Sequence, residues 1–149
     1  MKNRITPDNI TSLGLNEIFV FGSNESGKHG RGAAKTALKW GAKWKQAEGL
    51  QGRTYGIPTK NASITKTLSV DKIQHYVDNF IDFAAANKTR IFLVTEIGCG
   101  LAGLKPEQIA PLFADTIPLE NVYLPERFWT ILLTSTTPSG ANSIENTEP

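Results

Sequence analysis

The feature that most constrains the fold of this chain occurs twice: a short apolar strand runs into a glycine-rich loop and then into a helical pattern. The first copy is IFVFGSNESGKHGRGAAKTAL, residues 18–38, and the second is IFLVTEIGCGLAGLKPEQIAPLF, residues 91–113. Uninterrupted β-branched and aromatic strands are typical of parallel sheets that are buried on both faces. Glycines at the carboxyl ends of such strands let backbone N–H groups approach a ligand, and a following helix N-terminus favours an anion. The pair therefore predicts a site for a phosphorylated, nucleotide-like molecule.

The rest of the chain alternates between strand and helix patterns. Strands are expected at residues 18–21, 54–58, 91–95 and 121–124, with loops at 46–52 and 61–70. Helices are expected at 33–44, at 72–86 with Ser69 or Asp71 as cap, from Lys105-Pro106 onward, and at 125–133, where residues 130–133 (TILL) also fit a strand. This alternation predicts a three-layer α/β/α domain with a mainly parallel central sheet.

Length and composition predict one ordinary globular domain. Residues 1–133 are expected to form it, followed by a disordered tail at 134–149 that is rich in Ser, Thr, Pro and Asn. The net charge of +2 is compatible with an anionic small molecule and too mild to call for nucleic acid. Lys35, Lys39 and Lys43 follow one another at helical spacing, and we interpret them as a solvated face in preference to a phosphate-attracting edge.

Cysteine and histidine are too scarce to organise a site of their own. One cysteine excludes an internal disulfide framework, and together with two histidines it argues against a dedicated zinc site, so no metal or cofactor is predicted. The N-terminus lacks the apolar core of a signal peptide, and no run approaches the ~18 apolar residues of a membrane span. We therefore expect a soluble cytoplasmic protein; the sequence does not indicate its oligomeric state.

The first loop nearly matches the phosphate-loop pattern G-x-x-x-x-G-K-[ST]. Residues 22–29, GSNESGKH, fit every position except the last, where His29 replaces the hydroxyl that holds magnesium. Gly30 and Gly32 follow where the helix of a P-loop would be wound, and each costs about 1 kcal/mol in a helix interior. Glu96 only loosely imitates the magnesium-carrying aspartate after a second strand. A P-loop phosphotransferase is thus an alternative function.

The other interpretation of this loop is a close-approach turn that ends at a helix N-terminus. Asn24, at the strand end, either orients a ribose hydroxyl or only satisfies the loop backbone through an Asx-turn, and the sequence leaves both open. His29 and His75 fit the surface, or a position behind the ligand contacts, better than direct ligation. The candidate ligand-binding residues of the first loop are Gly22, Ser23, Asn24, His29, Gly30, Arg31, Gly32 and Ala33.

The second loop carries three glycines within residues 98–103, a density that turn geometry alone does not explain. Its candidate ligand-binding residues are Thr95, Gly98, Cys99, Gly100, Leu101, Ala102 and Gly103. Cys99 has no histidine near it in sequence, so packing is favoured over a nucleophilic role. Glu96 could serve as a base or have a structural role. If the protein catalyses a reaction, Asn24 and Glu96 are the candidate catalytic residues.

In this order the segments resemble a macrodomain, the fold known for binding ADP-ribose, and more narrowly a macrodomain-like group of small bacterial and phage proteins. FGSN resembles the strand that ends in an asparagine-containing loop, and HGRGAA resembles the glycine turn that opens the first major helix. EGLQGRTYGIPT is similar to the passage into the next strand, and TEIGCGLAGL resembles the loop that wraps the diphosphate and distal ribose. The resemblance covers roughly residues 17–125.

The resemblance implies that Asn24 contacts the distal ribose or the nearby loop, that Gly30, Gly32 and Ala33 lie near the phosphates, and that residues 98–103 surround the diphosphate. It also implies an acidic residue for adenine, for which Asp8 and Glu17 are candidates. Many hydrolytic macrodomains carry an acidic residue directly after the glycine turn, where this chain has Ala33, Ala34 and Lys35. The expected function is therefore binding of ADP-ribose or a related nucleotide, with ADP-ribosyl hydrolysis less well supported.

A third interpretation is a non-catalytic protein-interaction module whose glycine loops pack closely against a partner protein. A crevice blocked by Trp40, Trp44 or the C-terminal segment would favour it over ligand binding.

Overall fold

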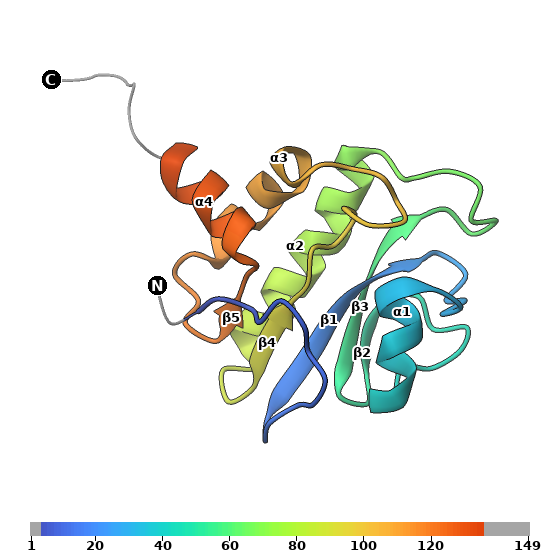
Figure 1. Ribbon diagram of the computed structural model, residues 1–149, viewed down its shortest axis with the longest axis horizontal. Coiled ribbons are helices and arrows are strands. Elements are labelled where there is room, and N and C mark those ends of the chain that lie inside the picture. The colour runs from blue at the N-terminus through green and yellow to red at the C-terminus, as the bar shows by residue number, and fades with distance from the viewer. Residues whose placement is uncertain (1–3, 136–149) are drawn as a thin grey trace, which may run out of the picture.

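The structure is a computed structural model in which residues 4–135 are described (Figure 1). Five strands form one sheet in the order β2-β3-β1-β4-β5. Their bounds are Glu17–Asn24 for β1, Gly49–Gln51 for β2, Thr54–Lys60 for β3, Ile91–Val94 for β4 and Val122–Tyr123 for β5. β1 pairs in parallel with β3 and β4, β4 pairs in parallel with β5, and β2 alone is antiparallel. The predicted α/β class with a mainly parallel sheet is confirmed.

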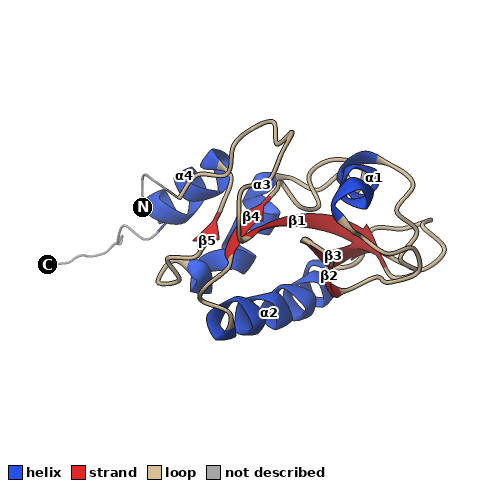
Figure 2. Cartoon of the chain, turned by 90° about the horizontal axis from the view of Figure 1, so that it is seen from below, coloured by secondary structure: helices blue, strands red, loops and turns tan. Residues whose placement is uncertain are grey.

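Helices cover both faces of this sheet. They are α1 (Gly32–Ala37), α2 (Val70–Ala86), α3 (Pro106–Ile109) and α4 (Glu126–Ser135), with 3-10 turns at Leu38–Trp40 and Ala110–Thr116. Figure 2 shows α1 on one face and α2 on the other. The Ser69 hydroxyl caps α2 by accepting a hydrogen bond from the Lys72 amide at 3.2 Å, as one of the two predicted caps.

Side chains of β1 alternate between two cores. Ile18 and Val20 face the larger core, which includes Phe80 of α2, whereas Phe19 and Phe21 face a smaller core under α1. This period of two buries both faces of the strand, so β1 forms the centre of the sheet. Tyr55 of β3 is 3% exposed and packs against Phe80 and Phe83, so it belongs to the larger core.

The N-terminal segment extends the sheet beyond β5, where no element was firmly predicted. Ile5 pairs in parallel with Leu124, and the buried Arg4 guanidinium donates to the carbonyls of Thr116, Ile117 and Val122. Burial is the main cause that lowers the pKa of Arg4. Residues 6–10 thereby lie beside the N-terminal end of α4 and form one wall of a cavity described below.

Several expected boundaries were wrong. The helix predicted at 33–44 ends as an α-helix at Ala37, so Lys43 lies beyond it and the lysine row is not one helical stripe. At Gly41, φ is +103°, and a Cβ there would lie 2.9 Å from Gly52 Cα, so a close crossing of two segments stops the helix. β2 lies within the loop predicted at 46–52.

The ends of the described chain also differ from expectation. α4 runs to Ser135, two residues into the predicted tail, and residues 136–149 lie outside the described residues. Among the described helices, none has the length and apolar character needed to cross a membrane.

Candidate functional site

The two glycine loops meet where the chain direction across the sheet changes. After β1 the chain crosses to β3 on one side, and after β4 it crosses to β5 on the other, although β1 and β4 are neighbours. Ligands of open α/β sheets bind at the carboxyl ends of strands at such a switch point. The topology therefore places both loops at the position where this fold forms a crevice.

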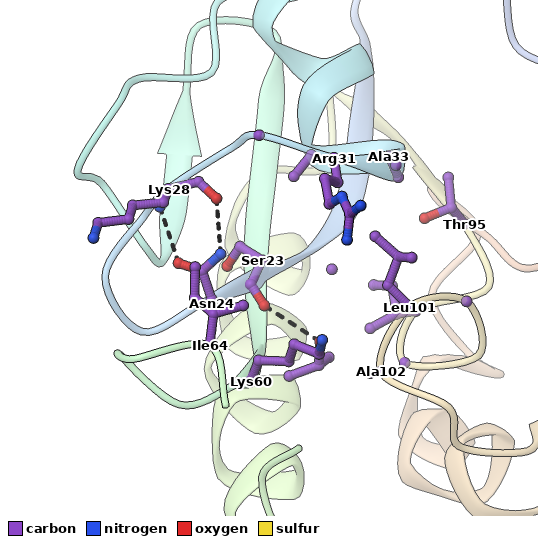
Figure 3. Close-up of a pocket in the computed structure, with 18 of the residues that line it drawn as sticks. Ser23, Asn24, Lys28, Arg31, Ala33, Lys60, Ile64, Thr95, Leu101 and Ala102 are labelled. Carbon is purple, nitrogen blue, oxygen red and sulfur yellow. Dashed lines mark hydrogen bonds between the residues drawn. The ribbon is translucent and has the colours of Figure 1, made fainter. Parts of the chain in front are cut away.

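A cavity of about 670 Å³ lies between the loops, a size within the range of small-molecule sites (Figure 3). It brings together most of the predicted residues: Gly22, Ser23, Asn24, Gly30, Arg31, Gly32, Ala33, Thr95, Glu96, Gly98, Gly100, Leu101 and Ala102. It also contains residues that were not among the predicted ligand-binding residues, although Lys28 is the lysine of the phosphate-loop pattern: Lys28, Ala34, Thr59, Lys60, Ile64 and Ile97.

Three predicted ligand-binding residues, His29, Cys99 and Gly103, do not line the cavity. His29 is fully buried rather than at the surface, with its ring against Phe21 and its Nε2 3.2 Å from Gln51 Oε1. Burial raises the pKa of the Cys99 thiol to about 11, so the group is a thiol at neutral pH and not a nucleophile. These residues support the loops from behind.

The Asn24 side chain makes the loop contacts of an Asx-type turn. Its Nδ2 donates to the Lys28 carbonyl at 2.8 Å, and its Oδ1 accepts from the Lys28 amide at 2.9 Å and from Ser26 Oγ at 2.8 Å. The residue is 7% exposed. Of the two interpretations left open by the sequence, these contacts favour the structural one, because the amide already holds residues 24–28 together.

The second loop leaves four of its backbone N–H groups without a hydrogen-bond acceptor in the described part of the protein. In the described structure, the N–H groups of Gly98, Gly100, Leu101 and Ala102 donate to no protein acceptor, although all four residues line the cavity. The neighbouring amides of Cys99, Gly103 and Leu104 are used within the loop and fix its shape. Successive free amides in a concave loop form a site suited to an anion.

Two cavity glycines are not required by the protein itself. Neither Gly30 nor Gly100 has a positive φ, and a Cβ on either would meet no protein atom within 4 Å. Glycine in such a position costs chain entropy without relieving strain or a clash. Both residues leave room for a ligand to approach the backbone closely.

The cavity is cationic. Lys28, Arg31 and Lys60 line it, and none of the three forms an ion pair with a described residue. Lys60 ends β3, which runs past the end predicted at residue 58, so the sequence prediction missed it. Ligands of such sheets bind at the carboxyl ends of the strands, and this holds for β3 as well as for β1 and β4. The position of Lys60 just after a predicted strand could therefore have identified it.

Glu96, a candidate base, is held by an arginine of α4. Arg127 Nε donates to Glu96 Oε2 at 2.7 Å, and Arg127 Nη2 donates to Glu96 Oε1 at 2.5 Å. This hydrogen bonding is the main cause that lowers the pKa of Glu96. A carboxylate with a lowered pKa is a weaker base, so the geometry favours the structural role for Glu96.

A second cavity of about 660 Å³ adjoins the first and shares Ala33, Thr95 and Glu96 with it. Asp8, one of the two acidic candidates for adenine, lines this second cavity. Glu17, the other candidate, lines neither cavity, and its carboxylate accepts a hydrogen bond from the Gly14 amide at 2.7 Å. Because the two cavities share these residues they lie side by side, and we call the pair the trough.

No protein-family model, curated protein or solved structure matches this chain. Within residues 4–135, no group of three or more His, Cys, Asp or Glu side chains is placed to hold a metal ion.

Proposed function

We propose that this protein binds ADP-ribose, or a closely related nucleoside diphosphate, along the trough in a macrodomain-like, three-layer arrangement. The diphosphate would lie against the free amides of Gly98, Gly100, Leu101 and Ala102, with Arg31 as a nearby cation. The adenosine would occupy the second cavity, where the Asp8 carboxylate can accept a hydrogen bond from an exocyclic amine.

The observation that carries the proposal is the open space at Gly100. Its φ is not positive and a Cβ would contact no protein atom within 4 Å, yet the residue lies among free amides on the cavity wall. A phosphate oxygen that accepts from such amides must approach the backbone to about 2.9 Å, which a Cβ would obstruct. Glycine at this position is therefore explained by an anionic ligand.

The two other functions fit the geometry less well. The helix after the first loop begins at Gly32, four residues beyond Lys28, and β1 extends through Gly22 to Asn24, so these residues do not form the wrapped loop of a P-loop NTPase. Neither Trp40 nor Trp44 lines either cavity, so neither tryptophan blocks the site as a protein-interaction module would suggest. Binding, without hydrolysis, is what we propose, because Glu96 is paired with Arg127.

Calorimetric titration with ADP-ribose tests this proposal. We expect saturable binding without added metal, and at least a tenfold loss of affinity for Gly100→Ala, which removes about the free energy of one charge-assisted hydrogen bond. Gly14→Ala is the control, because Gly14 lies outside both cavities and the atoms nearest to a Cβ there belong to the Glu17 side chain. No heat at millimolar ADP-ribose, or magnesium-dependent ATP binding that Lys28→Ala abolishes, would contradict the proposal.

A further inference from the structure

The turn at residues 61–67, after β3, is held by side-chain hydrogen bonds to the backbone. Asn61 Oδ1 accepts hydrogen bonds from the amides of Thr65 at 2.9 Å and Lys66 at 3.2 Å. Thr67 Oγ1 donates to the Ala102 carbonyl at 2.6 Å, which ties the turn to the second glycine loop. The backbone of this turn is therefore held in place beside the cavity.

Ile64, within this turn, has a φ of +59°. A β-branched residue in the left-handed region is strained, whereas glycine or asparagine occupies it readily. The Ile64 side chain is 37% exposed, belongs to neither core cluster, and lines the cavity. Stability of the free protein therefore does not explain isoleucine here, and strain at a cavity wall points to a ligand contact.

The surroundings of Ile64 indicate what that contact is. Figure 3 places Ile64 and Lys60 on the side of the cavity opposite Thr95, and Thr95 is the point where the second cavity adjoins. An apolar side chain that shares one side of the cavity with a lysine that has no ion pair within the described chain suits a neutral aromatic ring, which offers an apolar face and a negative π-face.

We propose that Ile64 is a specificity-determining residue that packs against a second base, so that the preferred ligand is a dinucleotide with two neutral bases. This inference rests on the proposed function: one adenine lies in the Asp8 cavity, the diphosphate lies at the glycine loops, and the second ring lies at Ile64. ADP-ribose carries only a hydroxyl where such a dinucleotide carries its second base, and it leaves the Ile64 contact unused.

Titration of ADP-ribose and of diadenosine diphosphate into three proteins tests the inference: the unaltered chain, Ile64→Gly and Lys45→Gly. Lys45 is the matched control, because it has a φ of +75° but lies outside both cavities. Glycine relieves left-handed strain and adds chain entropy in both variants, so their melting temperatures should shift in the same direction. Only Ile64→Gly removes the ligand contact.

We expect diadenosine diphosphate to bind the unaltered chain about fivefold to tenfold more tightly than ADP-ribose, the effect of burying roughly 40–60 Å² of apolar surface. Ile64→Gly should abolish this preference and leave ADP-ribose affinity nearly unchanged, while Lys45→Gly should preserve the preference. Oxidised NAD, whose nicotinamide ring is cationic, should bind more weakly than diadenosine diphosphate because of Lys60.

Three outcomes would overturn the inference alone: equal affinity for the two ligands, an equal loss of both in Ile64→Gly, or a lower melting temperature confined to Ile64→Gly. If the unaltered chain binds neither nucleotide, the proposed function itself fails, and the inference fails with it.

Discussion

The two glycine loops are anchored in the same way. Each has a glutamate close to the end of its strand that a neighbouring helix holds: Glu25 accepts a hydrogen bond from Tyr76 Oη of α2 at 2.6 Å and pairs with Lys72 at 3.0 Å, and Glu96 pairs with Arg127 of α4. The Glu25 hydrogen bond is the main cause that raises the pKa of Tyr76 to about 12. Both loops are therefore fixed at the point where they leave the sheet.

Both loops leave backbone donors unpaired within the described chain, including the amides of His29, Gly30 and Arg31 in the first, but they are held in different ways. The first is held by the Asn24 side chain and by the Lys45 amide, which donates to the Gly27 carbonyl at 2.8 Å, whereas the second is held by hydrogen bonds within its own backbone. Glycine content alone does not separate these cases. The informative glycines are those, such as Gly30 and Gly100, that neither φ nor packing requires.

The largest change in stability is expected for one of two glycines of the first loop, Gly27 and Gly30. Gly27 has a φ of +69°, and a Cβ there would lie 2.5 Å from backbone atoms of Lys45 and Gln46. Gly27→Ala should lower the free energy of unfolding by roughly 2–4 kcal/mol, because both strain and a clash with backbone arise. Gly30→Ala should be neutral or slightly stabilising. Urea denaturation measures both, and equal effects would show that the two glycines have the same role.

The next effect concerns Asn24. Asn24→Ala removes the three hydrogen bonds of a buried side chain and should lower the free energy of unfolding by roughly 1–3 kcal/mol. The unfolding midpoint in urea measures this change. Unaltered stability together with lost ADP-ribose affinity would instead assign the amide to a ribose hydroxyl, the alternative that the sequence left open.

The sequence predicted features that depend on neighbours along the chain. The uninterrupted apolar run of β1, the helical pattern of α2 and its Ser69 cap are local patterns, and all three are present. Most of the cavity was also predictable, because the carboxyl ends of parallel strands meet at one edge of a sheet.

The features that the sequence did not predict depend on distant contacts. β2 forms an edge strand only because β3 offers it an antiparallel partner. The helix after the first loop stops at Gly41 because Gly52 crosses it, and His29 is buried because Phe21, Trp44 and Gln51 enclose it. Neither the crossing of Gly41 and Gly52 nor the enclosure of His29 produces a pattern in the spacing of residues along the chain.

A smaller effect, with a pH signature, is expected for the anchor of the first loop. Hydrogen bonding by Tyr76 is the main cause that lowers the pKa of Glu25 from 4.5. A lowered carboxyl pKa stabilises the folded state above the unfolded-state value, and this contribution is lost as the pH falls through the folded-state value. Glu25→Gln should therefore lower the free energy of unfolding by about 0.5–1.5 kcal/mol at pH 7.

Thermal unfolding from pH 7 to pH 3 measures this anchor. The difference in melting temperature between the unaltered chain and Glu25→Gln should be constant down to about pH 5 and should shrink below the unfolded-state pKa near 4.5. A difference that does not change with pH would mean that the ionised carboxylate does not anchor the loop.

The smallest effect is expected for the anchor of the second loop, because Arg127 is exposed and its ion pair is solvated. Arg127→Ala should leave the melting temperature almost unchanged, but it exposes the Glu96 carboxylate to an anionic ligand and should weaken ADP-ribose binding about twofold to fivefold. The pKa of Glu96, followed by NMR, should rise toward its ordinary value once the arginine is removed. Glu96→Gln removes the negative charge at this position, so this variant should not weaken binding of the anionic ligand. If Glu96→Gln weakened binding as much as Arg127→Ala, the geometry of the pair rather than the charge of Glu96 would matter, and the second loop would depend on side-chain support as the first one does.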